Sequence, residues 1–299
     1  MRVRAPATTA NLGPGFDSLG LALQLYNELE VVERTGGVTE VEVSGEGAGA
    51  IPTDESNAVL GAMRCVYQRL GRPLPPVYLR QTNAILLARG LGSSAAATAA
   101  GIVAANALAG YPFGRDELVD MATAFEGHPD NITPCLVGGL AVSAMEETHV
   151  YYAPVEVPEG LAVVLYVPDF EISTRAARRH LSETYSRADA IFTLSRAALT
   201  TAALATGRWD LLRIGMQDCM HQPYRARGYP EMPHLIQAAL DAGARGAALS
   251  GSGPTIAAFV DDGGQAVAAA LQQAGTEQGL SGRVLHLAID RQGTVVEDE

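Results

Sequence analysis

The sequence predicts an α+β protein with two domains. Short β-rich runs and helical segments occur in both halves, without the regular strand–helix alternation of a barrel or a doubly wound sheet. A chain of 299 residues has room for one or two domains. The stretch 154–160 contains Pro154, Pro158 and Gly160, and the pattern of strands and helices restarts after it. We therefore expect one domain over residues 1–157 and a second over residues 158–299.

The first domain is expected to contain two hairpins with two helices between them. Gly36 and Gly37 interrupt two β-rich runs and predict a turn, whereas Gly110 and Gly127 follow helical patterns as stop signals. One helical pattern is an Ala-rich run that starts at a serine, and the other has apolar residues at i, i+3, i+4 and i+7. In chain order, the elements are a hairpin of Leu29–Glu33 with Val38–Val43, helices over 94–109 and 116–126, and a hairpin of Leu140–Met145 with Thr148–Ala153.

The second domain is expected to mix strands and helices in a less regular order. It begins with a strand that looks buried on both faces, and two later strands flank a Gly-rich turn. The elements are a strand over 161–167, helices over 189–205 and 232–242, strands over 247–249 and 256–260, a helix over 265–274 and a closing strand over 284–289.

The charge balance excludes several kinds of partner and chemistry. Asp and Glu total 33 against 21 Lys and Arg, which gives a net charge of −12, and all 21 basic residues are arginines. Nucleic acids and anionic membrane surfaces are bound by cationic patches, so we expect neither as a partner. Without lysine, the chain has no Schiff-base or pyridoxal-phosphate lysine and no Walker A lysine.

Cysteine usage and hydropathy predict a cytoplasmic protein. Cys65, Cys135 and Cys219 are odd in number and widely spaced, so we expect free thiols in a reducing compartment rather than disulfides or a zinc site. The longest apolar candidate, Ala95–Ala109, is interrupted by polar residues and is shorter than the ~18–20 residues of a membrane span. The N-terminus lacks the apolar stretch of a secretory signal.

A Gly- and Ser-rich segment, Arg89–Ala96, leads directly into the Ala-rich helix. Gly90 and Gly92 allow a tight turn and a close approach of a ligand to the backbone. The free N–H groups and the positive dipole at a helix start favour phosphate. The segment therefore predicts a phosphate site, with a Ser-capped helix after a Gly turn as the structural alternative. It matches neither a Walker A loop nor a dinucleotide fingerprint.

Two further loops contain clustered polar residues. In Pro6–Gly20, Asn11 and Asp17 offer acceptors for the ammonium group of a ligand, and an Asx-turn loop is the alternative. Leu249–Thr255 has two glycines and three hydroxyl side chains between two strands. This composition is typical of a backbone close to a bound anion, and also of a plain tight turn.

Together, Pro6–Gly20, Ala88–Ala96 and Ser250–Thr255 resemble the three motifs of the GHMP kinase superfamily. The first of them and a fourth stretch, Glu126–Asn131, narrow the resemblance to the homoserine kinases, and it covers nearly the whole chain. Leu86 departs from the family, whose phosphate loop usually has proline there, but this residue shapes the entry to the loop rather than its chemistry. The resemblance implies a two-domain GHMP kinase fold with the active site in the cleft between the domains.

The activity that the resemblance implies is ATP-dependent phosphorylation of the side-chain hydroxyl of L-homoserine to O-phospho-L-homoserine, in threonine biosynthesis. ATP and Mg²⁺ are the implied cofactors. Ser94 and Glu126 would bind the metal, and the carboxylate of Glu126 at a helix C-terminus would gain from a nearby cation. Without the resemblance, Glu126 would be interpreted as a solvent-exposed glutamate rather than a metal ligand. The segment that would contact the ATP phosphates comprises Leu86, Leu87, Ala88, Arg89, Gly90, Leu91, Gly92, Ser93, Ser94, Ala95 and Ala96.

The implied substrate site combines groups for an ammonium, a carboxylate and a hydroxyl. The ammonium would bind Asn11 and Asp17, and the carboxylate would bind two arginines, whose planar forks suit bidentate pairing. Without the resemblance, each arginine would be taken for a surface residue and the histidine for a structural hydrogen-bonding group. The substrate-binding residues would be Asn11, Asp17, His128, Asn131, Thr174, Arg178 and Arg225.

The residues expected near the reacting hydroxyl are His128, Asp130 and Asn131. Asp130 is the nearest candidate for a general base, although the family is thought to transfer the phosphoryl group directly, which a loose transition state tolerates. Two alternatives stay open: a GHMP kinase for another small alcohol, such as mevalonate or a sugar, and a nucleotide-binding protein without catalysis. The ammonium-plus-carboxylate site disfavours the first, and the presence of Ser94 and Glu126 disfavours the second. The resemblance is compatible with a homodimer, which nothing in the sequence requires.

Overall fold

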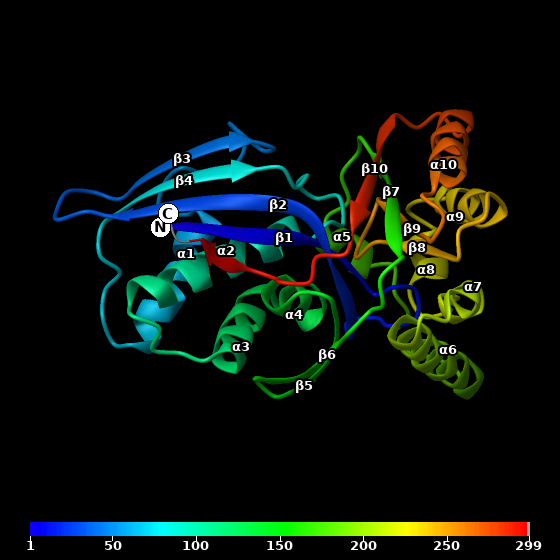
Figure 1. Ribbon diagram of the computed structural model, residues 1–299, viewed down its shortest axis with the longest axis horizontal. Helices are drawn as coiled ribbons and strands as arrows, with labels where there is room; N and C mark the ends of the chain where they lie inside the picture. Colours follow the sequence, from blue (N-terminus) through cyan, green and yellow to red (C-terminus); the bar gives the residue numbers. More distant parts are fainter. Residues whose placement is uncertain (298–299) are drawn as a thin grey trace.

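The computed structural model describes residues 1–297 and contains two β-sheets, each with helices packed against it (Figure 1). The first sheet has the order β11-β1-β2-β4-β3, and β5 extends it by pairing with β2 and with β6. Its pairs are antiparallel except for β3 with β4, which is parallel. Its strands are β1 (Arg2–Ala10), β2 (Leu19–Glu33), β3 (Glu40–Gly45), β4 (Val77–Asn83), β5 (Leu140–Glu146), β6 (His149–Val155) and β11 (Val295–Glu297).

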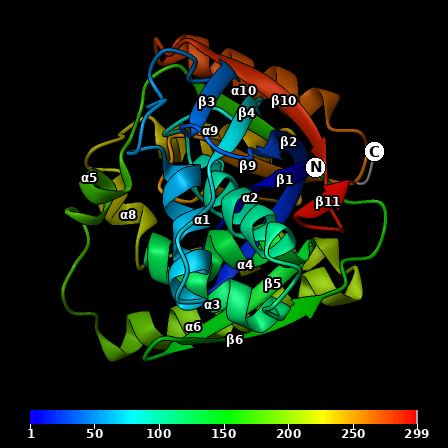
Figure 2. The same ribbon diagram turned by 90° about the vertical axis from the view of Figure 1, so that its left-hand side faces the viewer.

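Four helices cover one face of this sheet, and they lie below its strands in Figure 1 and toward the viewer in Figure 2. They are α1 (Ala58–Arg69), α2 (Ser93–Leu108), α3 (Arg115–Glu126) and α4 (Pro129–Val137). Helix α2 is central, because it contacts the other three helices as well as β1 and β2. Most of its alanines, including Ala95, Ala96 and Ala99, are buried, and such small side chains let the neighbouring backbones approach closely.

The second sheet is antiparallel, with the order β10-β7-β9-β8, and is covered on both faces. Helices α9 and α10 pack with it around one core, whereas Val163, Leu165 and Phe259 belong to the same core as the first sheet. The strands are β7 (Ala162–Pro168), β8 (Gly246–Leu249), β9 (Ile256–Val260) and β10 (Gly282–Ala288). The helices are α5 (Thr174–Arg178), α6 (Arg187–Thr206), the 3-10 turn η1 (Trp209–Leu211), α7 (Leu212–Gly215), α8 (Gln222–Arg225), α9 (Met232–Asp241) and α10 (Gln265–Glu277).

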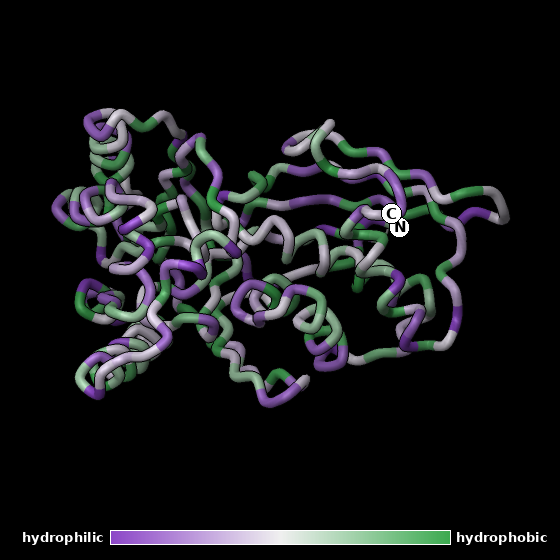
Figure 3. The backbone as a smooth tube through the Cα atoms, turned by 180° about the vertical axis from the view of Figure 1, so that it is seen from behind, coloured by the Kyte–Doolittle hydropathy of each residue, from purple (hydrophilic) through white to green (hydrophobic). Residues whose placement is uncertain are grey.

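Most of the predicted elements are confirmed. The Ala-rich helix, the helix ending before Gly127, the hairpin of β5 with β6, and the strands and helices of the second half all form within a few residues of their predicted bounds. Figure 3 shows hydrophobic and hydrophilic residues alternating along the strands of the first sheet, the pattern expected for strands with one buried face. The expected boundary at residue 157 lies in the connection between β6 and β7, and it stays a prediction.

Two predicted strand arrangements are wrong. The segments 29–33 and 38–43 were expected to pair across Gly36-Gly37, but β4 lies between β2 and β3 and pairs with both. The segment 284–289 was expected to close the chain, yet β10 is followed by β11, which pairs with β1 in the first sheet. Within residues 1–297, we find no helix that combines the length and the apolar character of a membrane span.

Candidate active site

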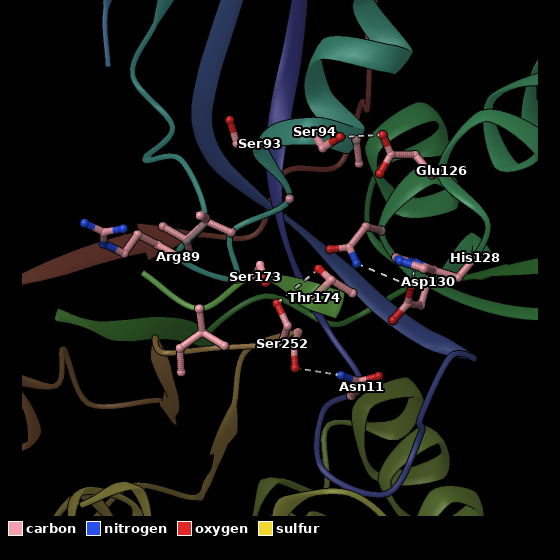
Figure 4. A pocket seen from close by; sticks show the side chains of 18 of the residues that line it. Asn11, Arg89, Ser93, Ser94, Glu126, His128, Asp130, Ser173, Thr174 and Ser252 are labelled. Atoms are coloured by element: carbon pink, nitrogen blue, oxygen red, sulfur yellow. Dashed lines mark hydrogen bonds and ion pairs between the residues drawn. The ribbon is translucent and has the colours of Figure 1, made fainter. Parts of the chain in front are cut away.

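A cavity of about 270 Å³ lies where the start of α2 faces the second sheet and its loops. Figure 4 shows that its side chains come from segments far apart in the sequence. The cavity includes most of the predicted site residues, Gly251 and Ser252 from the predicted loop Leu249–Thr255, and two residues that were not singled out, Ile172 and Ser173. Its predicted members are Asn11, Asp17, Ala88, Arg89, Gly90, Leu91, Gly92, Ser93, Ser94, Ala95, Glu126, His128, Asp130, Asn131, Thr174, Arg178 and Arg225.

The predicted phosphate loop forms a wall of this cavity and ends in the first turn of α2. Gly90 and Gly92 have φ values of +74° and +69°, in the left-handed region that glycine adopts at low cost. Helix α2 begins at Ser93 without a side-chain cap on its first N–H groups, so these donors and the helix dipole face the cavity. This geometry suits an anion.

Three members of the predicted loop do not line this cavity. Leu86 packs partly buried against the core, Leu87 lines a neighbouring cavity, and Ala96 is fully buried in α2. The side chain of Arg89 points away from the start of α2 (Figure 4) and donates through Nε to the carbonyl of Pro168 at 2.9 Å. The contact of these four side chains with phosphate stays a prediction.

The loop that follows β8 supports the phosphate loop from behind. Ser250 Oγ donates to the Gly90 carbonyl at 2.6 Å and lies 2.8 Å from Thr9 Oγ1. The backbone N–H of Gly251 donates to the carbonyl of Ala10 at 3.1 Å. The Ser- and Gly-rich loop therefore joins β1 to the phosphate loop, and its Gly251 and Ser252 also line the cavity.

Ser94 and Glu126 lie in contact, as Figure 4 shows. Ser94 Oγ donates to Glu126 Oε1 at 2.6 Å, and Thr98 Oγ1 donates to the same oxygen at 2.9 Å. Glu126 is the last residue of α3, where the helix dipole opposes its negative charge. The three side chains form a cluster of oxygen atoms beside the start of α2.

His128, Asp130 and Asn131 are linked at the start of α4. His128 Nδ1 lies 2.7 Å from Asp130 Oδ1, and Asn131 Nδ2 donates to the same oxygen at 3.3 Å. The hydrogen bond to Asp130 raises the pKa of His128 above its ordinary value, against the effect of burial. Thr8 Oγ1 donates to Asn131 Oδ1 at 2.8 Å and so orients the amide of Asn131.

Asp17 and Arg178 form a bidentate ion pair. Arg178 Nη1 and Nη2 donate to the two carboxylate oxygens at 2.9 and 2.6 Å, which raises the pKa of Arg178. The backbone N–H of Asp17 donates to Asn11 Oδ1 at 3.1 Å, and Asn11 Nδ2 donates to the Gly251 carbonyl at 2.9 Å. The predicted ammonium-binding side chains are thus oriented by groups of the protein itself.

Arg225 lies at the bottom of the cavity and is 5% exposed. Its Nη1 donates to the Gly251 carbonyl at 2.6 Å, and burial lowers its pKa to about 10, so it stays protonated at neutral pH. Thr174 Oγ1 lies 3.4 Å from Ser252 Oγ, and both side chains line the same cavity (Figure 4).

Models of the two GHMP kinase domains match this chain, the N-terminal one over residues 57–139 and the C-terminal one over residues 200–277. The homoserine kinase of Deinococcus radiodurans is 48% identical over 297 residues, which are 99% of this chain and 96% of that protein. The chain belongs to the homoserine kinase family. The crystal structure of a homoserine kinase from Cytophaga hutchinsonii has a TM-score of 0.90 to it at 29% identity, with 99% of this chain and 96% of that chain covered.

The resemblance of the sequence to this family and the two-domain GHMP kinase fold are therefore confirmed. Mevalonate kinase from L. major, with a TM-score of 0.69 at 16% identity over 95% of each chain, shares the fold alone. The family relation thus separates this chain from the kinases of other small alcohols that have the same architecture.

A second cavity, of about 280 Å³, adjoins the phosphate loop of this homoserine kinase family member. Ser93 and Ser94 line both cavities, and Leu87, Gln81 and Asn57 line the second. Asn57 is 1% exposed and caps α1, because its Oδ1 accepts from the backbone N–H groups of Val59 and Leu60.

Sequence reasoning missed several residues that shape the site. Thr98 follows Ser94 by one helical turn and therefore lies on the same face of α2, a spacing that points to it as a partner of Glu126. His221 precedes Arg225 by four residues, a spacing that also points to their contact. No comparable local signal marks Thr8 or Phe16, because their partners come from distant parts of the chain.

Proposed function

We propose that the protein transfers the terminal phosphoryl group of ATP to the side-chain hydroxyl of L-homoserine and releases O-phospho-L-homoserine for threonine biosynthesis. The observation that carries the proposal is that one cavity joins the start of α2, which has no side-chain cap, to side chains of both charges. A carboxylate, Asp17, and a buried arginine, Arg225, complement the two charged groups of an amino acid. The full-length likeness to homoserine kinases supports the same substrate.

The ATP phosphates would lie on the loop from Ala88 to Gly92 and the first turn of α2. Their charge would be met by backbone N–H groups and the helix dipole, since the chain has no lysine. The second cavity begins at Ser93 and Ser94 and offers room for the nucleoside. Positioning of this kind supplies much of the catalysis in phosphoryl transfer.

Mg²⁺ fits the oxygen cluster at the ends of α2 and α3. Ser94 and Glu126 would hold it, and Thr98 adds a hydroxyl to the same carboxylate oxygen. Mg²⁺ is usually held in kinases by one or two carboxylates together with substrate phosphates, so a site with one acidic residue suffices. When bound, the ion would neutralise charge on the phosphates.

The reacting hydroxyl would lie against His128 and Asn131. The Asp130 carboxylate fixes the His128 ring through Nδ1, which leaves Nε2 as the ring atom able to contact a ligand. The hydroxyl oxygen would bond to the transferred phosphorus while the bond to the leaving ADP oxygen breaks. The hydroxyl proton would pass to an oxygen of the transferred phosphoryl group, so no side chain needs to serve as general base.

A sugar has neither charged group and mevalonate has a carboxylate but no ammonium, so neither substrate would use Asp17 and Arg225 together. A regulator without catalysis would be free to lose Ser94 and Glu126. The cytoplasm is the proposed location, in agreement with three free cysteines. The homodimer that the family suggests stays a prediction.

The test is release of ADP with Mg-ATP across homoserine, serine, threonine, mevalonate and a panel of sugars. Homoserine should give the highest kcat/KM, with O-phosphohomoserine identified by mass spectrometry. An excess of EDTA should abolish turnover, and added Mg²⁺ should restore it. Equal or higher kcat/KM with mevalonate or a sugar would refute the substrate assignment, and full activity in EDTA would refute the role of the metal.

A further inference from the structure

One side chain of the phosphate loop, that of Arg89, points away from the start of α2 (Figure 4) and contacts the connection between β7 and α5. This connection, residues 169–173, leads from the second sheet to the helix that contributes Thr174 and Arg178 to the cavity. Two residues of the connection line the cavity as well. The position of the connection therefore decides where one wall of the site lies.

The guanidinium of Arg89 is engaged on several sides by the protein itself. Nε donates to the carbonyl of Pro168 at 2.9 Å, and Nη2 donates to the carbonyl of Asp169. Nη1 donates to the carbonyl of Leu87 at 3.1 Å and lies 3.2 Å from a carboxylate oxygen of Glu171. The side chain is only 12% exposed. Most of its donors are thus used before any ligand binds.

The connection has few polar contacts besides those from the phosphate loop. The backbone N–H of Ile172 donates to the carbonyl of Ala88 at 3.3 Å, which is a second contact with that loop. At its other end, the N–H of Asp169 donates to the carbonyl of Ser281 at 2.9 Å. Residues 169–171 are exposed, so little packing holds them. The place of the connection therefore depends mainly on the phosphate loop.

The backbone of the phosphate loop does not depend on the Arg89 side chain in the same way. The carbonyl of Gly90 accepts from Ser250 Oγ at 2.6 Å, and the carbonyl of Leu91 accepts from the N–H of Thr8 at 3.0 Å. Both bonds remain when the side chain of Arg89 is shortened or replaced. Loss of the guanidinium should therefore release the connection while the loop keeps its shape.

We propose that Arg89 is a positioning residue for the amino-acid substrate: from within the phosphate loop, it holds residues 168–172 and thereby places α5 against the cavity. The proposal rests on the proposed function, in which α5 lies beside the amino acid. Hydrogen bonds from a charged, planar guanidinium are strong and directional, so the carbonyls of Pro168 and Asp169 are the main contacts. Glu171 is 65% exposed, and its ion pair adds little.

The test uses three variants and a matched control. Arg89→Met removes the donors at similar length, Arg89→Lys keeps the charge without the planar fork, and Glu171→Gln removes the ion pair alone. Arg213→Met is the control, because Arg213 also donates to a backbone carbonyl, that of Leu240 at 2.8 Å, and pairs with the exposed Asp241. Arg213 lies on α7 and does not line the cavity.

Arg89→Met should raise the KM for homoserine by about tenfold and change the KM for ATP by less than about twofold. The dissociation constant of homoserine without nucleotide, from ligand-observed NMR, should rise by the same factor. Arg89→Lys should restore part of the affinity, since an ammonium still donates to carbonyl oxygens. Glu171→Gln and Arg213→Met should stay within about twofold of the wild type.

Hydrogen exchange, followed by mass spectrometry without any ligand, tests the position of the connection directly. In Arg89→Met, the amides of residues 169–178 should exchange at least about tenfold faster than in the wild type. The amides of residues 90–96 should keep their rates, because the loop retains its own backbone contacts. Arg213→Met should leave both segments unchanged.

The proposal is overturned if Arg89→Met raises the KM for ATP as much as the KM for homoserine, because Arg89 would then act on the phosphates. Unchanged exchange over residues 169–178 in this variant would also overturn it. Failure of the proposed function would look different. The wild-type protein would then transfer no phosphate to homoserine, while the difference in exchange between the wild type and Arg89→Met would remain.

Discussion

The substitution Gly92→Ala tests how the start of α2 is packed. A Cβ at this position would lie 2.0 Å from Thr8 Oγ1 and 3.3 Å from Asn131 Oδ1. The hydroxyl of Thr8 would have to move by about 1 Å to reach an ordinary separation. The movement breaks its hydrogen bond to Asn131, which holds the Asn131 amide in the cavity.

The cost can be worked out from three contributions to the free energy of unfolding. The left-handed backbone at φ +69° costs an alanine about 1 kcal/mol, the lost hydrogen bond about 1 kcal/mol and the crowding about 1 kcal/mol more. Gly110 is the matched control, because it follows the other end of the same helix with φ +83°, and a Cβ added there would meet no atom within 4 Å. Gly110→Ala should therefore cost about 1 kcal/mol and Gly92→Ala about 3 kcal/mol.

Urea denaturation measures the two costs, and steady-state kinetics measures their effect on the site. Gly92→Ala should lower kcat by at least about tenfold, because Asn131 loses its orientation, whereas Gly110→Ala should keep wild-type kcat and KM. Equal losses of stability in the two variants would refute the packing argument. A destabilised Gly92→Ala protein with wild-type kcat would refute the role of Thr8 in orienting Asn131.

Two further predictions concern the acidic residues and the histidine of the site. Glu126→Ala should lower kcat more than Asp130→Asn, because a loose transition state depends on charge neutralisation more than on deprotonation, and kcat values in the opposite order would contradict this. The hydrogen bond to Asp130 raises the pKa of His128 above its value in the unfolded chain. The contribution of this bond to the free energy of unfolding is therefore complete below about pH 6.5 and is lost as the pH rises through the raised pKa. The melting temperatures of the wild type and His128→Gln should therefore differ more at about pH 5.5 than at about pH 9, and a gap that grows toward high pH would disprove it.

The sequence is informative wherever a pattern is local. The periodic apolar residues before Gly127 and the Ala-rich run before Gly110 predict α3 and α2, since both signals lie within the element itself. The pairing of β2 was mispredicted for the complementary reason. Gly36 and Gly37 do form a loop, but the partner of both flanking strands is β4, which lies more than 30 residues further along the chain.

In the candidate site, too, local features could be predicted from the sequence and long-range contacts could not. The glycine turn and the start of α2 beside it could be predicted from Gly90, Gly92 and the serines, because one short segment contains all of them. The pairing of Arg178 with Asp17 spans 161 positions, and no property of either residue alone indicates it. Such contacts depend on how the two sheets are placed, which only the tertiary structure determines.

The return of β11 to the first sheet has a mechanical consequence. The second sheet and its helices, residues 162–288, lie in the sequence between β6 and β11, two strands of the first sheet. They are therefore connected to the first sheet at both ends. The two connections lie close together, because residues 159–161 and 288–290 line the same cavity, of about 490 Å³. Because Val163, Leu165 and Phe259 of the second sheet also share a core with the first sheet, the two connections and this common core together fix how the second sheet faces the start of α2.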